Sequence, residues 1–216
     1  MEIFATLIMI PVMLLNLLAG IVGGIGLLVQ GDWRTVLFGL VYAFLAPCIL
    51  SIALLPGLLT APIVIWAERK DRIGLAIIAA TPSLLWTWLI MSGSIIVLYG
   101  GIVQQSDGDF FHVLWGYSTA IGPWLFLAKK DHQTGNDSAF IGVTFCQFGL
   151  ISMICATWID RANLEIFRLA SWFLPFAILG IAAQLAIVLI ETRNERKYRH
   201  RHAIPASRID STDSFL

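Results

Sequence analysis

Six long stretches without any charged residue constrain this chain more than any other feature of its sequence. They run over residues 3–29, 35–60, 73–103, 111–128, 139–159 and 169–190. All 14 Lys and Arg residues and all 14 Asp and Glu residues lie outside them. A helix needs about 20 mostly apolar residues to cross the hydrocarbon core of a bilayer. The sequence therefore predicts an all-α, polytopic transmembrane helical bundle with about six spans over residues 1–190. A basic cytoplasmic tail, 191–216, follows, and we expect it to be flexible.

Charge is too scarce for a water-soluble protein. Charged residues make up 13% of the chain and hydrophobic residues 58%, whereas a soluble domain is about a quarter charged. The net charge is zero, so it does not favour a nucleic-acid partner. The three cysteines lie inside apolar stretches, and we expect them to pack as small apolar residues rather than to form disulfides. They are Cys48, Cys146 and Cys155.

The cations divide unequally between the two sides of the predicted membrane. With six alternating spans, one side carries three Lys or Arg residues in 68–72, two in 129–137 and six in the tail. The other side carries Arg34, Arg161 and Arg168. Because short loops rich in Lys and Arg stay in the cytoplasm, we expect both termini to be cytoplasmic. The short loops and this strong bias favour a bacterial inner (plasma) membrane.

Two stretches contain features that disturb a straight helix. The second continues to Trp66 and contains Pro47, Pro56 and Pro62. Proline removes a backbone donor and clashes with the preceding turn, so we expect this span to end near Leu59. The residues after it should then turn along the interface or re-enter the membrane.

The third stretch, 73–103, is longer than a hydrocarbon core of about 30 Å requires. We therefore expect it to tilt, to kink at Pro82 or to extend beyond the bilayer. Trp86 and Trp88 lie at its centre, where an indole N–H needs an acceptor. At least one of these two side chains should face other helices rather than lipid.

Small residues predict where helices meet. Gly20 and Gly24 form a GxxxG pattern in the first stretch, and such a face lets two backbones approach closely. The face can pack within the chain or contact another subunit.

Several uncharged polar residues lie inside the stretches and suggest a polar cavity. They are Asn16, Trp88, Gln147 and Gln184. Polar groups in hydrocarbon need partners, so these residues can form a small site for a neutral solute. Hydrogen bonds between helices are the alternative.

The sequence DGDFFH offers one candidate metal site, formed by Asp107, Asp109 and His112. Oxygen and nitrogen donors suit Mn²⁺ or Zn²⁺. A solvated loop that caps the following helix explains the same residues. A haem cofactor is disfavoured, because no histidine lies in the interior of a stretch to serve as an axial ligand. The phosphate-binding and hydrolase motifs are also missing, so the sequence leans away from an enzyme.

The tail begins with a run of cations that is suited to anionic lipid headgroups. These residues are Arg193, Arg196, Lys197, Arg199 and Arg201.

Three functions remain open from the sequence. The first is a non-catalytic accessory or assembly subunit of a membrane complex, bound to partner subunits or to further copies of itself. The second is a carrier or channel for a neutral or lipidic solute. The third is a metal-dependent membrane enzyme that uses the Asp/His cluster.

Overall fold

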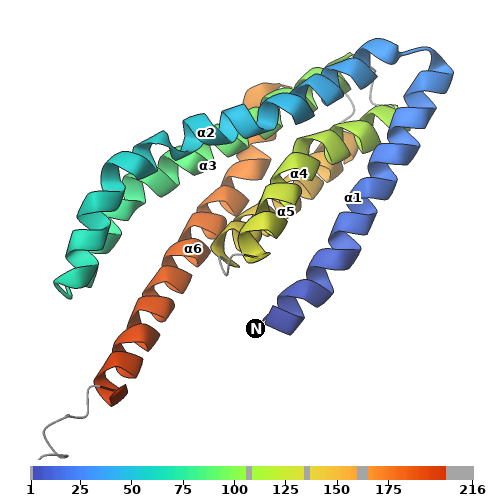
Figure 1. The fold of residues 1–216 in the computed structure, drawn as a ribbon. Coiled ribbons are helices and arrows are strands. Elements are labelled where there is room, and N and C mark those ends of the chain that lie inside the picture. The colour runs from blue at the N-terminus through green and yellow to red at the C-terminus, as the bar shows by residue number, and fades with distance from the viewer. Residues whose placement is uncertain (1, 106–108, 134–136, 160–164, 203–216) are drawn as a thin grey trace, which may run out of the picture.

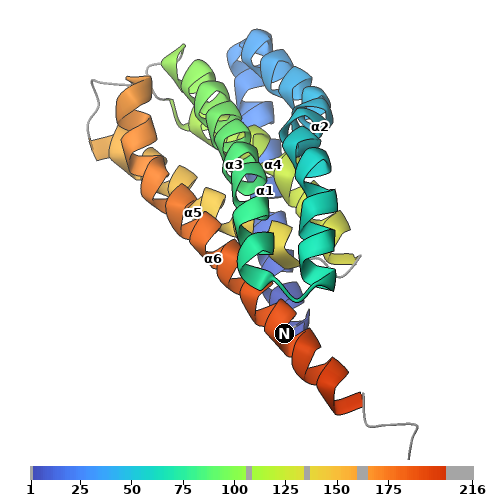
Figure 2. The ribbon, with the colours of Figure 1, turned by 90° about the vertical axis from the view of Figure 1, so that its left-hand side faces the viewer.

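The fold is all-α and consists of six long helices (Figure 1). The computed structural model describes residues 2–105, 109–133, 137–159 and 165–202. The helices are α1 (Glu2–Gln30), α2 (Trp33–Arg69), α3 (Ile73–Gln104), α4 (Phe110–Gln133), α5 (Asp137–Ile159) and α6 (Ile166–His202). They run alternately up and down, so α1 begins and α6 ends at the same end of the bundle (Figures 1 and 2). We call this the terminal end and the other the distal end.

Five of the helices are long and apolar enough to cross a membrane, which identifies a multi-pass membrane protein. The segments of these helices that could cross a membrane are Leu7–Gln30, Trp33–Arg69, Ile73–Gln104, Ala139–Ile159 and Ile166–Ile187. Within the described part of the chain, α4 is not among them.

The lower hydropathy of α4 has a structural reason. Helix α4 packs against α1, α2, α3 and α5, and side chains from four of its turns are buried. They are Val113, Trp115, Ala120, Ile121, Trp124, Leu125 and Ala128. A helix surrounded by protein does not need the continuous apolar surface that lipid requires, because polar groups can find partners on its neighbours.

Helix α2 contradicts the expectation of an end near Leu59. It continues without a break to Arg69 and contains Pro47, Pro56 and Pro62. Each proline removes one backbone donor, whereas unwinding the helix in lipid would expose several backbone groups that have no other partner. Keeping the helix intact is therefore the less costly arrangement.

The neighbouring helix compensates for one of these prolines. Because Pro56 lacks an N–H, the carbonyl of Ile52 loses its donor four residues along the helix. The indole Nε1 of Trp86 on α3 donates to that carbonyl at 3.4 Å. The hydroxyl of Thr87 also donates to the carbonyl of Ala53, at 3.0 Å. These two bonds therefore join α3 to α2 next to Pro56, where α2 lacks one of its own backbone hydrogen bonds.

Trp88 confirms the expectation that one central tryptophan of α3 faces other helices. Its side chain is only 3% exposed, whereas Trp86 is 39% exposed. Helix α3 passes through Pro82 without ending. With 32 residues, it is about 48 Å long, well beyond the thickness of a hydrocarbon core.

Candidate functional site

A tight turn between α1 and α2 places Asp32 at the distal end. Gly31 has a φ of 82°, a left-handed conformation that glycine adopts without strain. The Asp32 amide donates to the Leu27 carbonyl (2.9 Å) and the Gly31 amide to the Leu28 carbonyl (3.1 Å). This pattern is a Schellman motif, which satisfies carbonyls at the end of α1.

Asp32 then caps the first turn of α2. One carboxylate oxygen accepts a bond from the Thr35 amide (3.2 Å), and the other accepts from the Thr35 hydroxyl (2.7 Å). The Thr35 carbonyl in turn accepts a bond from Trp115 Nε1 on α4 (3.0 Å). The turn is therefore bonded to α4 as well as to its own helix.

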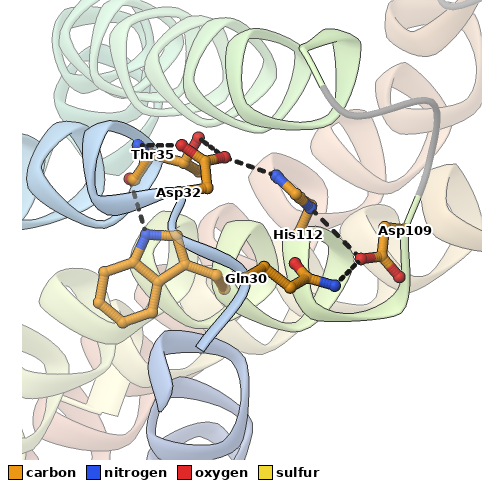
Figure 3. Close-up of polar contacts among 6 residues, drawn as sticks. Gln30, Asp32, Thr35, Asp109 and His112 are labelled. Carbon is orange, nitrogen blue, oxygen red and sulfur yellow. Dashed lines mark hydrogen bonds and ion pairs between the residues drawn. The ribbon is translucent and has the colours of Figure 1, made fainter. Parts of the chain in front are cut away.

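His112, in the first turn of α4, lies between two carboxylates (Figure 3). Its Nε2 is 2.8 Å from Oδ2 of Asp32, and its Nδ1 is 4.0 Å from Oδ2 of Asp109. The side-chain amide of Gln30, at the end of α1, donates to the same Asp109 oxygen. We call Gln30, Asp32, Asp109 and His112 the distal cluster. It joins the last residue of α1, the cap of α2 and the start of α4.

Burial and hydrogen bonding shift the pKa of Asp32 in opposite directions. Burial raises its pKa, but the hydrogen bonds from Thr35 and His112 outweigh that effect, so the pKa of Asp32 lies below its ordinary value. His112 is 7% exposed. Its Nδ1 makes no hydrogen bond within the described residues. The ring is thus oriented by Asp32 and presents its second nitrogen to Asp109.

The structure brings together only part of the predicted metal site. Asp109 and His112 are neighbours, whereas Asp107 lies outside the described residues. Asp32, which the sequence analysis did not single out, is the carboxylate closest to His112. Among the described residues, no three His, Cys, Asp or Glu side chains form a group that could hold a metal ion. The sequence did contain a signal for Asp32. An Asp shortly before an apolar stretch is typical of a helix N-cap, and its side chain bonds Thr35 three residues later.

The polar residues predicted to form one cavity lie on different pairs of helices. The Ser118 hydroxyl of α4 donates to the Asn16 carbonyl of α1 at 2.9 Å. Trp88 Nε1 of α3 donates to Oε1 of Gln184 on α6 at 2.7 Å. Gln147 of α5 is buried, and its Nε2 has no partner among the described residues. Each of the two bonded pairs joins two helices.

Sequence reasoning missed a third polar contact, which joins three helices. Trp124 Nε1 of α4 donates to the Tyr42 hydroxyl of α2 at 3.1 Å. The same hydroxyl is 3.1 Å from the Ser94 hydroxyl of α3. The indole and phenol groups within apolar stretches were the available signal, because both need a partner when buried.

Helix α1 packs its small residues against α4. A Cβ atom at Gly20 would lie 2.5 Å from the Ser118 hydroxyl, and one at Gly24 would lie 2.9 Å from the Trp115 ring. Gly39 of α2 approaches the other edge of that ring. These three glycines therefore permit close contact between helices of the same chain.

The part of the α2–α3 hairpin nearest the terminal end is largely uncovered by the other helices. We call residues 54–86 the α2–α3 arm; all of them are described, and only two, Ala67 and Ala76, are buried. A Cβ atom at Gly57 or Gly74 would have no neighbour within 4 Å. Figure 1 shows the arm diverging from α1, α4 and α5 towards its tip.

No protein-family model, curated protein sequence or solved structure matches this chain.

Proposed function

We propose that this is a six-span membrane protein with both termini in the cytoplasm. In this proposal it acts as a non-catalytic accessory or assembly subunit of a larger membrane complex. The α2–α3 arm is the element that binds the partner.

The arrangement of helices and charges supports this topology. Helix α4 runs the length of the bundle beside its apolar neighbours, so it is the remaining span. The tip of the arm, with Arg69, Lys70 and Arg72, lies at the terminal end, while Arg34 lies at the distal end (Figures 1 and 2). More cations at the terminal end favour a cytoplasmic location for it.

The uncovered surface of the arm is the observation that carries the proposed function. Gly24 of α1 and Gly39 of α2 lie against a neighbouring helix. In the arm, Gly57 and Gly74 face open space. Because small residues let a second helix approach closely in a membrane, the arm offers a surface that another transmembrane helix can cover.

The interior polar groups bond helices to one another, and this supports a non-catalytic role. Trp88, Ser118 and Trp124 all form hydrogen bonds between helices, and such bonds stabilise a bundle. In the distal cluster, Asp32 caps α2 and orients His112. These contacts have structural roles in joining the helices.

Native mass spectrometry of the protein, purified gently from its own membranes, tests the proposal. The wild type should carry a stoichiometric protein partner, and Gly57→Leu should lose it. Gly93→Leu is the matched control, because Gly93 also faces open space but lies on α3 outside the arm. A wild type without a partner, or a Gly57→Leu variant that retains it fully, would contradict the proposal.

One observation favours a second function, a carrier for a neutral solute. The buried Nε2 of Gln147 lacks a partner among the described residues, and a buried amide of this kind can bind a solute carbonyl or hydroxyl. Flux through proteoliposomes should then fall in a variant that combines Asn16→Leu with Gln147→Leu. Unchanged flux would exclude this function.

A further inference from the structure

Helix α6 continues well beyond its membrane-crossing segment. The apolar residues of α6 end at Ile190, whereas the helix ends at His202. At 1.5 Å per residue, the extension is about 18 Å long. Figures 1 and 2 both show α6 projecting past the other helices at the terminal end.

Within the membrane, α6 has a bundle-facing side and an outward side. Phe173, Ala177 and Gly180 are buried against the bundle. Leu179 is 54% exposed and Ile190 is 56% exposed. Because a helix turns about 100° per residue, these two sets lie on different sides of α6, with centres roughly 120° apart.

The cations of the extension continue the outward side. Steps of three and four residues lead from Leu179 through 182 and 186 to Ile190 and then into the extension. The helix positions reached there are those of Arg193, Arg196, Lys197, His200 and Arg201, which we call the cationic stripe. Such steps keep residues on one face of a helix.

The acidic residues of the extension continue the bundle-facing side of α6. Similar steps lead from Phe173 and Ala177 through 180, 184 and 188 to the positions of Glu191 and Glu195. By helix position, the cationic stripe therefore continues the outward side of α6, and the acidic residues continue the bundle-facing side. Arg199 lies between the two faces.

We infer that the cationic stripe binds the headgroups of anionic phospholipids that surround α6. Its position on the outward side, directly after the membrane-crossing segment, places it where the headgroups of the surrounding lipids lie. A general need for cytoplasmic cations explains their number. It does not explain why they share the face that contacts lipid.

Continuity with the lipid-exposed side favours a lipid over a soluble polyanion. A nucleic acid would require cations but would not require them to align with Leu179 and Ile190. Each cation near an anionic leaflet raises binding by about fivefold. The effect of a pair of cations is therefore measurable.

The experiment uses the full chain in nanodiscs of equimolar phosphatidylcholine and phosphatidylglycerol. Native mass spectrometry then counts the lipids that stay bound when the protein is released. We expect wild type to retain mainly phosphatidylglycerol. Arg193→Gln combined with Arg196→Gln should reduce this preference by roughly 25-fold at low salt, because two cations are lost.

A charge-exchanged variant is the matched control. It combines Glu191→Arg and Glu195→Arg with Arg193→Glu and Arg196→Glu, so the net charge stays the same while the stripe is broken. Loss of phosphatidylglycerol in this variant supports the stripe. Retention at the wild-type level would overturn it, because net charge alone would then suffice. Tight binding of single-stranded RNA to the wild type in place of phosphatidylglycerol would overturn it as well.

Discussion

At the scale of single residues, Asp32 has two tasks. It caps α2 through Thr35, and it orients His112 of α4. His112 lies 80 positions after Asp32 in the chain. Replacement of a helix cap by alanine typically lowers the free energy of unfolding by about 1 kcal/mol. Because Asp32 also makes a contact between helices, Asp32→Ala should lower it by more than that.

The lowered pKa of Asp32 predicts how stability depends on pH. A carboxyl group whose pKa is lower in the folded state stabilises the fold above its unfolded pKa, and this contribution is lost as the pH falls through the folded value. The unfolding temperature of purified wild type should therefore fall on acidification, and by less in Asp32→Asn. Thermal unfolding of both proteins in detergent across the acidic range measures this difference. Parallel pH profiles would contradict the role of Asp32.

At the scale of elements, the α2–α3 hairpin depends on contacts between its two helices. Pro56 leaves the Ile52 carbonyl without its helical donor, and Trp86 supplies one from α3. The bond is long, at 3.4 Å, so its contribution should lie at the lower end of the range for neutral hydrogen bonds, about 0.5 kcal/mol.

A double-mutant cycle tests this compensation. Trp86→Phe should destabilise the wild type, because the Ile52 carbonyl loses its donor. In a Pro56→Ala background the restored backbone N–H bonds that carbonyl, so the same substitution should cost less. Unfolding free energies from denaturant titrations of the four proteins give the coupling. An equal cost in both backgrounds would show that Trp86 acts only by packing.

The elements also show where prediction from sequence succeeded and failed. The absence of charge from six stretches correctly predicted six helices, because charged residues are costly in lipid. The three prolines of α2 wrongly predicted an end near Leu59. Local propensity counts the lost donor, but it does not include Trp86, which lies 34 residues away from Ile52 in the chain.

The candidate site was harder to predict for the same reason. Asp109 and His112 were identified because they are close in sequence. Asp32 was missed because its contact with His112 depends on how α1, α2 and α4 pack. Such contacts between distant segments follow from the three-dimensional arrangement and leave no local pattern.

At the scale of the whole molecule, α4 decides the topology. It is the helix whose hydropathy does not by itself indicate a span, and it lies against four other helices. If α4 crosses the membrane, the arm and the cationic stripe lie on the same side. The terminal end of the molecule would then combine a site for a membrane partner with a site for anionic lipid.

Labelling of single cysteines on either side of α4 tests the six-span topology most directly. In a variant without Cys48, Cys146 and Cys155, we would introduce Gln105→Cys or Lys130→Cys, both at exposed positions. A membrane-impermeant maleimide should label Gln105→Cys in intact cells, and Lys130→Cys only after the cells are permeabilised. Labelling of both positions from the same side would contradict the six-span topology.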